Sequence, residues 1–323
     1  MSDSLPDPFP SDSVIENTEF LAVYRAALVR LQRFGLSANP TCRLAVYERR
    51  IAELGAIDEA ELSSDQRLVL ANALCEASII VDIASLPDRY LDAIRPRLLT
   101  LKAGSEFENV EKPDRARDAA AELQFAARCH TRGGLGDPAM HRGDVLVRTP
   151  SGQFPAEIKR VSSSNRIRQR VKEAVSQLGP AKEGEPWGVI VLDVSAAVRM
   201  HFGFVEANTM PEFLDIAGQQ VTSFLRHYVI GALNYNEVAR EGILGILVRH
   251  VAYGWVGGSG NVRRSISTQA LPLVEEGGLS ESIFLEITRS IETGESVEGN
   301  EDAMRAAVDA YPLPIRRRAA RRE

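Results

Sequence analysis

The sequence predicts a mixed α/β fold, with a central sheet flanked by helices, preceded by an all-α N-terminal domain. Between Val14 and Thr100, apolar residues recur at three-to-four spacing, which is typical of amphipathic helices. From about residue 114 to residue 195 the pattern follows the order helix, strand, strand, helix, strand, which predicts a sheet covered by helices. A length of 323 residues agrees with two domains, or with one domain and a sizeable extension.

Composition limits the classes of protein to which the chain can belong. Hydrophobic residues make up 44% and charged residues 25%, so the chain can bury a core. Charged residues or histidine interrupt every apolar stretch before it reaches the length of a membrane span, so we expect a soluble protein without membrane association. Cys42, Cys75 and Cys129 are widely spaced and form no C-x-x-C pair, which argues against disulfides and zinc and favours the cytoplasm.

The N-terminal part of the chain is expected to contain two segments and a connector. Residues 1–13 are acidic and proline-rich, carry no signal-peptide pattern, and predict a disordered lead-in. Residues 14–110 predict the helical domain, because helical spacing recurs there between turn signals at Gly35, Asn39-Pro40, Gly55 and Pro87. The polar segment LKAGSEFENVEKPD then connects this domain to the next.

Residues 111–293 are expected to form the second domain. The Ala-rich segment RARDAAAELQFAARCH predicts a helix with Asp114 as its N-cap. The segment DVLVRTPSGQFPAEIKRV predicts two short strands around a Pro-Ser-Gly turn. Helical spacing returns in RIRQRVKEAVSQL, and WGVIVLDVS is a short apolar run typical of a buried strand.

The remaining segments give weaker signals. EFLDIAGQQVTSFLRHYVIGAL predicts a helix, and ILGILVRHVAYGWV predicts a strand that extends the sheet. GGLSESIFLEITRSIE predicts another helix, with Ile283, Ile287 and Ile291 along one face. Residues 294–323 are expected to be an acidic linker and a basic tail, because the closing segment YPLPIRRRAARRE is rich in arginine.

The hairpin carries the candidate chemistry. Glu157 and Lys159 are two positions apart on a strand, so their side chains project from one face and that of Ile158 from the other. A turn centred near Ser151-Gly152 would place Asp144 opposite Lys159, with Glu157 diagonally beside it. Carboxylates held together repel one another unless they share a cation or a proton. We therefore expect a site for Mg²⁺ (or Mn²⁺) made by Asp144, Glu157 and the backbone carbonyl of Ile158.

The segments GDVLV and AEIKR resemble the D…(D/E)-x-K hairpin of the PD-(D/E)XK nuclease superfamily, over about residues 114–195. The resemblance implies a restriction-endonuclease-like core and metal-dependent hydrolysis of phosphodiester bonds. Lys159 would orient the attacking water or stabilise charge on phosphorus. Glu122 in the preceding helix and Gln177 in the following helix match positions that often contribute to the family's site. Gly143 replaces the proline that often precedes the aspartate.

A local basic patch favours nucleic acid as the partner, although the whole chain carries a net charge of -6. Eight basic and three acidic residues lie between Asp144 and Lys182. The expected contacts with phosphate are Arg160, Arg166, Arg168, Arg170 and Lys172. We expect a DNA endonuclease in restriction, defence or repair, with an RNA-directed nuclease as an alternative and a homodimer left open.

Each assignment has a plainer alternative. Glu157 and Lys159 could form a surface ion pair on an edge strand, and Glu122 could be an ordinary surface charge of an Ala-rich helix. Gln177 could cap its helix or face water, and the arginines could form a solvated helix face. The rival functions are a catalytically inactive nucleic-acid-binding protein on a nuclease fold, and a scaffold built around the N-terminal helices.

Overall fold

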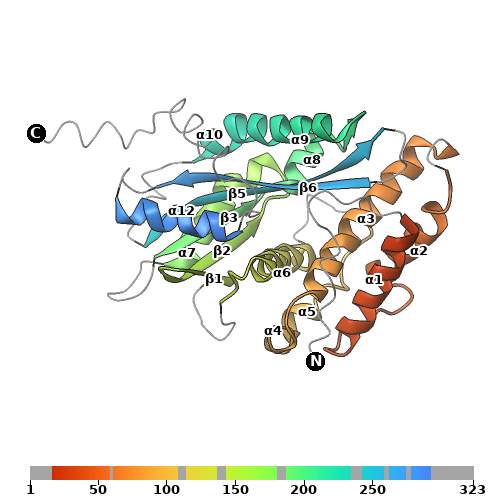
Figure 1. The fold of residues 1–323 in the computed structure, drawn as a ribbon, viewed down its shortest axis with the longest axis horizontal. Helices are drawn as coiled ribbons and strands as arrows, with labels where there is room; N and C mark the ends of the chain where they lie inside the picture. The colour runs from red at the N-terminus through yellow and green to blue at the C-terminus, as the bar shows by residue number, and fades with distance from the viewer. Residues whose placement is uncertain are drawn as a thin grey trace, which may run out of the picture.

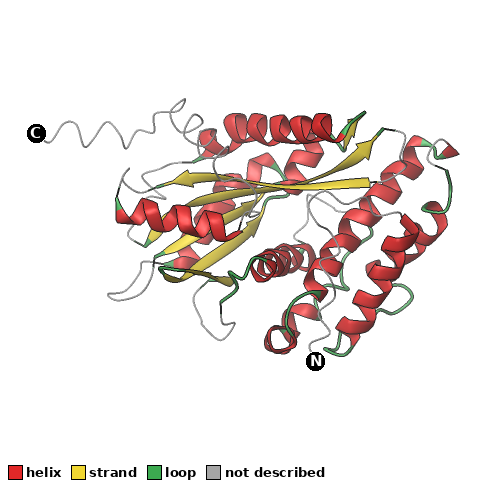
Figure 2. Cartoon of the chain, in the orientation of Figure 1, coloured by secondary structure: helices red, strands yellow, loops and turns green. Residues whose placement is uncertain are grey.

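The computed structural model of the chain has a mixed β-sheet with helices on both of its faces (Figures 1 and 2). The expected lead-in (1–13) and tail (294–323) lie outside the described residues. None of the described helices combines the length and the hydropathy needed to span a membrane. The residues that the structure describes are 17–58, 61–107, 114–136, 143–179, 187–233, 242–257, 262–273 and 278–291.

The described part of the N-terminal region is helical, as its apolar spacing predicts. It contains α1 (Asn17–Gln32), α2 (Arg43–Leu54), α3 (Ser64–Ala84), α4 (Asp88–Ala93) and α5 (Arg95–Leu98). A capping box begins α3: the Ser63 hydroxyl accepts from the Gln66 N–H, and the Gln66 side chain accepts from the Ser63 N–H. These helices bury their apolar residues in a cluster that continues onto one face of the sheet.

The sheet has the strand order β1-β2-β3-β5-β4. Strands β3 and β4 pair with the first and last parts of one edge of β5, and β6 pairs along its opposite edge. Strands β2, β3 and β5 run parallel, β4 runs parallel to β5, and β1 and β6 are antiparallel to their neighbours. The strands are β1 (Val145–Thr149), β2 (Gly152–Arg160), β3 (Gly188–Asp193), β4 (Val205–Ala207), β5 (Ile243–Val256) and β6 (Val262–Pro272).

Alternating side chains of the strands pack against different helices. Val189 and Val191 of β3 belong to the core of α6 (Arg115–Thr131) and α12 (Leu279–Ile291). Ile190 and Leu192 belong to the opposite core. That second core is covered by α7 (Ile167–Leu178), α8 (Ser195–Phe202) and α9 (Met210–Phe224), the last continuing through a π-helical turn (Leu225–Val229) into α10 (Ile230–Ala232).

The predicted order of helix, strand, strand, helix, strand is confirmed as α6, β1, β2, α7, β3. The mixed α/β class, the strand β5 and the helices α9 and α12 are confirmed as well. Sequence patterns gave no prediction for α8, β4 or β6. All three follow β3, where the pattern of the chain is weakest.

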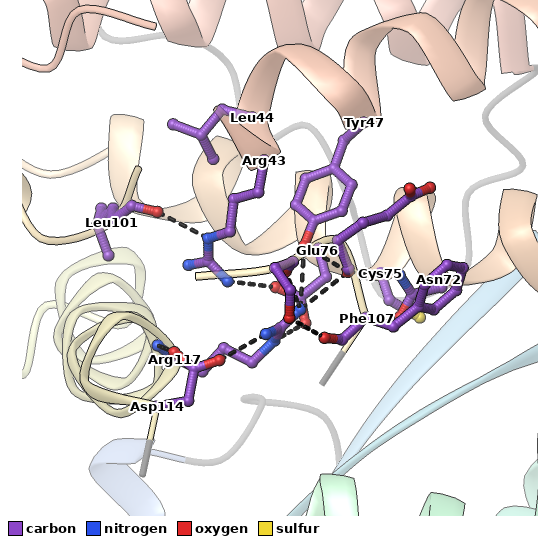
Figure 3. A network of polar contacts seen from close by, with 12 residues as sticks. Arg43, Leu44, Tyr47, Asn72, Cys75, Glu76, Leu101, Phe107, Asp114 and Arg117 are labelled. Carbon is purple, nitrogen blue, oxygen red and sulfur yellow. Dashed lines mark hydrogen bonds and ion pairs between the residues drawn. The ribbon is translucent and has the colours of Figure 1, made fainter. Parts of the chain in front are cut away.

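A buried network of charges fixes α6 against the N-terminal helices (Figure 3). The Glu76 carboxylate of α3 accepts from Arg117 of α6 at 2.9 Å and from Arg43 of α2 at 3.2 Å. Arg117 also pairs with the predicted N-cap, Asp114, which accepts from the Arg117 backbone N–H at 3.0 Å. Burial acts to raise the pKa of Glu76, but the guanidiniums of Arg117 and Arg43 hold it below its usual value. Because Glu122 follows on the same helix, this network also sets the position of Glu122.

Candidate active site

The β1–β2 hairpin brings Asp144 beside the strand that carries Glu157 and Lys159. Val145 pairs with Ala156, and the Asp144 backbone N–H donates to the Ala156 carbonyl at 2.9 Å. The residue opposite Asp144 is therefore Glu157, and the predicted register with Lys159 opposite is wrong by two positions. The physical reason is the turn: Thr149 pairs with Gly152, so the loop has two residues and its centre lies one residue earlier than predicted.

The Lys159 ammonium lies where the three predicted metal-binding oxygens converge. Its Nζ is 2.5 Å from Glu157 Oε1, 3.3 Å from the Ile158 carbonyl oxygen and 3.9 Å from Asp144 Oδ2. The Asp144 carboxylate also accepts from the Ile158 backbone N–H at 3.0 Å. Glu157 and Lys159 are both buried, so the alternative of a solvated surface ion pair does not describe them.

Glu122 of α6 completes the group, joined to it by an arginine from the N-terminal helices. Arg97 of α5 lies with Nη1 3.2 Å from Glu122 Oε2 and with Nη2 3.5 Å from Asp144 Oδ1. Three carboxylates thus gather around two cations. Glu122 is not an ordinary surface charge, because only 17% of its side chain is exposed.

The carboxylates of this group have raised pKa values, because they are buried and lie close to one another. Burial raises the pKa of Glu122 to about 7, and the neighbouring Asp144 adds to the effect, whereas Arg97 and Lys159 oppose it. Burial, again together with Asp144, raises the pKa of Glu157 to about 7 against the opposing effect of Lys159. Removing water penalises the ionised form, and so does a second carboxylate. A bound cation would relieve both penalties.

The donor chemistry fits a hard divalent cation. Carboxylate and carbonyl oxygens are the ligands that Mg²⁺ takes from proteins, and Mg²⁺ keeps several waters of its own. In the described residues, no cluster of three or more carboxylate, histidine or cysteine side chains is positioned to hold a metal ion. The set offered here consists of two carboxylates, Asp144 and Glu157, and the backbone oxygen of Ile158. A cation bound to these oxygens would have to displace the ammonium of Lys159.

Gln177 is not brought to this group. It lies in the last turn of α7 with an exposed side chain. No hydrogen bond joins it to a charged residue of the site among the described residues. Its observed environment is the plainer of the two alternatives, a polar side chain facing water.

The predicted phosphate-binding residues divide into two kinds. Arg170 of α7 donates to Asp118 of α6 at 3.1 Å, and Arg160 of β2 lies 4.0 Å from the same carboxylate. Both arginines have mostly buried side chains and connect β2 and α7 to α6. The remaining members are half-buried or exposed on the turn before α7 and on α7 itself: Arg166, Arg168 and Lys172.

Two residues that contact the predicted site residues escaped the sequence analysis. Asp118 lies four residues before Glu122, a spacing that places both on one side of a helix, so the helical pattern could have indicated it. Arg97 gave no signal, because it lies 47 residues from Asp144 and meets it only through the tertiary fold.

Comparisons of the chain with protein-family models, with curated proteins and with solved structures find no match. The resemblance to PD-(D/E)XK nucleases therefore depends on the sequence of this chain alone.

Proposed function

We propose that this chain is a metal-dependent phosphodiesterase on a restriction-endonuclease-like core, with DNA as its substrate. The observation that carries the proposal is the convergence of Asp144, Glu157 and the Ile158 carbonyl on a single cation, the ammonium of Lys159. Few structural roles require two largely buried carboxylates and a lysine to meet at the open end of a hairpin, away from its turn. Such a set can hold a divalent cation and a cationic side chain beside a phosphodiester, which suits metal-dependent hydrolysis.

Each residue has a role in the proposed reaction. Asp144, Glu157 and the Ile158 carbonyl would hold Mg²⁺ or Mn²⁺. When bound, this cation supplies polarisation of the scissile phosphate and a coordinated water of lowered pKa. Lys159, released from Glu157, donates its N–H groups to the attacking water or to the oxygens on which charge develops. Glu122 adds negative charge beside Asp144, which favours a divalent cation at this place.

Arg168 and Lys172 support a nucleic-acid partner. Both are exposed on α7, the helix that directly follows the strand of Glu157 and Lys159. Exposed arginine and lysine side chains bind backbone phosphates without regard to base sequence. By resemblance, an endonuclease of restriction, defence or repair is the form of activity that we propose.

The main rival is a nucleic-acid-binding protein on an inactive nuclease fold. The presence together of Glu122, Asp144, Glu157 and Lys159 favours an active enzyme, because binding alone needs no buried carboxylates. An RNA substrate is a second alternative, and substrate comparison separates it from DNA.

The test is cleavage by the purified full-length protein. Supercoiled plasmid, linear DNA and RNA are each incubated with Mg²⁺, Mn²⁺ or EDTA, and the products are separated on gels. We expect DNA products with either metal and none with EDTA. Glu157→Gln should abolish the products, whereas Glu206→Gln should not, because Glu206 is exposed on β4. Equal activity of Glu157→Gln and the unchanged protein would contradict the proposal.

A further inference from the structure

Arg97 is the residue of the site that comes from outside the sheet and its adjoining helix α6. It lies on α5, and its guanidinium bridges Glu122 and Asp144 while also lying 3.5 Å from the Asp144 backbone carbonyl. Its side chain is 43% exposed, against 17% for Glu122 and 12% for Asp144. The guanidinium therefore lies on the solvent side of the two carboxylates.

The ion pairs of Arg97 are too long to contribute much to the stability of the fold. Charge-assisted hydrogen bonds between nitrogen and oxygen are usually about 2.7–2.9 Å long. Those of Arg97 are 3.2 and 3.5 Å, whereas the buried Lys159 pair measures 2.5 Å. A half-exposed ion pair of this kind contributes little to folding. The position of Arg97 is better explained by the charges that it faces.

The backbone of Arg97 is nevertheless firmly placed. Ile94, Leu98 and Leu101 are buried in the core shared by the helical region and the sheet. The Thr100 hydroxyl donates to the Arg97 carbonyl at 2.8 Å. The helical region thus presents a long cationic side chain, from a fixed backbone, to the carboxylates of the proposed metal site.

The charges of the group explain what such a side chain can do. With ionised groups, the carboxylates of Glu122, Asp144 and Glu157 exceed the cations of Lys159 and Arg97 by one negative charge. A divalent cation would reverse this to one positive charge, which the single negative charge of a phosphodiester balances. Without Arg97, the group would be more negative when no metal is bound. With the divalent cation bound, it would have no net positive charge to balance the phosphate.

We propose that Arg97 competes with the divalent cation for Glu122 and Asp144 in the resting protein, and binds the substrate phosphate once the cation has displaced it. This inference rests on the proposed function and assigns a task to the helical region. The planar guanidinium suits both partners, because its forked N–H groups match carboxylate and phosphate oxygens alike. Exchange between them requires movement of the side chain only.

The test uses Arg97→Ala in the full-length protein, with Arg95→Ala as the matched control. Arg95 lies on the same short helix, is exposed, and points away from Arg97 because residues two apart lie on different sides of a helix. Mn²⁺ is titrated calorimetrically into each protein without nucleic acid. We expect Arg97→Ala to bind Mn²⁺ about tenfold more tightly, as expected when a like charge beside the ion is removed. Arg95→Ala should stay within about twofold of the unchanged protein.

The second readout is binding of a fluorescent DNA duplex in Ca²⁺ at several salt concentrations, with gels to verify that the duplex stays intact. Arg97→Ala should weaken binding and reduce the salt slope by about 0.9, the value for one lost phosphate contact. Arg95→Ala should change neither.

The outcomes separate the two proposals. If the unchanged protein binds Mn²⁺ and cleaves DNA, but Arg97→Ala behaves like Arg95→Ala in either readout, the role of Arg97 is overturned and the nuclease proposal stands. If the unchanged protein neither binds Mn²⁺ nor cleaves, both are overturned together. Tighter Mn²⁺ binding with weaker duplex binding, confined to Arg97→Ala, supports the inference.

Discussion

The ammonium of Lys159 lies 2.5 Å from a carboxylate oxygen of Glu157, its neighbour two positions earlier on the same face of β2. Only 10% and 4% of the two side chains are exposed. A cation and an anion so deeply placed hold each other in position, and the removal of one leaves the other poorly paired. Substitutions of the two residues should therefore have opposite effects on metal binding.

Lys159→Ala should abolish most cleavage but leave Mn²⁺ affinity unchanged or increased. The substitution removes a positive charge beside the metal site and frees Glu157 to bind the ion. Loss of one preorganised electrostatic contact should lower the cleavage rate by at least about 10²-fold. Calorimetric titration of Mn²⁺ into the folded variant, alongside a cleavage assay, measures both effects. Weaker Mn²⁺ binding by Lys159→Ala would mean that the lysine organises the site rather than competing with the ion.

Asp144→Ala and Glu157→Ala should lose cleavage and metal affinity together. Each removes an oxygen ligand from the ion that would carry much of the transition-state stabilisation, so the rate should again fall by at least about 10²-fold. The same titration and assay apply, with Glu206→Ala as an exposed carboxylate control. A variant of Asp144 that keeps full activity would remove that residue from the site.

The sequence alone was sufficient for the central part of the fold because the strands and helices there carry regular patterns. Ala156 and Ile158 alternate with Glu157 and Lys159, so the apolar pair packs into the core of α6 and the ionic pair projects from the other face of the strand. Strand β6 shows the limit of this reasoning. Its sequence, VRRSISTQALP, is mostly polar, and it becomes a strand by pairing along β5 rather than through a pattern of its own.

The candidate site could be predicted as a set of residues but not as a geometry. Asp144, Glu157 and Lys159 follow from local spacing, yet the register between them depends on where the turn is centred. A centre at Pro150-Ser151 rather than at Ser151-Gly152 moves the partner of Asp144 by two positions. Arg97 could not be predicted, because no local sequence pattern indicates a contact between α5 and the residue before β1. Gln177 was selected through resemblance alone, and no contact supports it.

Replacement of Arg168 and Lys172 by alanine should weaken nucleic-acid binding uniformly across sequences. Both side chains are exposed on α7. Arg170 is left unchanged because its side chain is mostly buried and links α7 to α6 through Asp118. Loss of two phosphate contacts should reduce the salt slope by about 1.8 for duplex DNA. Fluorescence anisotropy over a range of salt concentrations measures this slope. An unchanged slope would assign the two residues to a solvated helix face.

Arg117→Met should destabilise the protein without removing any residue of the site. The side chain is buried, and its loss leaves Glu76 with Arg43 as its remaining cation in the network of Figure 3. Breaking a buried charge network from one side costs on the order of 3 kcal/mol. Urea unfolding followed by circular dichroism measures the loss, with Arg115→Met, exposed on the same helix, as the control. Equal stabilities would show that Arg43 alone satisfies Glu76.

Glu122 and Glu157 should lower the free energy of unfolding as the pH rises from about 4.5 to about 7. The measurement uses a chelating buffer so that no divalent cation occupies the site. Burial and the neighbouring Asp144 raise the pKa of both residues from 4.5 to about 7. The folded protein therefore binds protons that the unfolded chain has released, and stability is lost through this window and stays low above it.

Because the two residues influence each other, their combined effect should be on the order of 3 kcal/mol, close to that of one full shift. Urea unfolding of the unchanged protein and of Glu157→Gln at pH 5 and pH 8 isolates the contribution. The amide cannot ionise, so the variant should lose less stability between the two values than the unchanged protein, whereas Glu206→Gln should lose as much. If Glu157→Gln and the unchanged protein show the same pH dependence, the carboxylates of the site are not held together as described, and the electrostatic basis for a bound cation is lost with them.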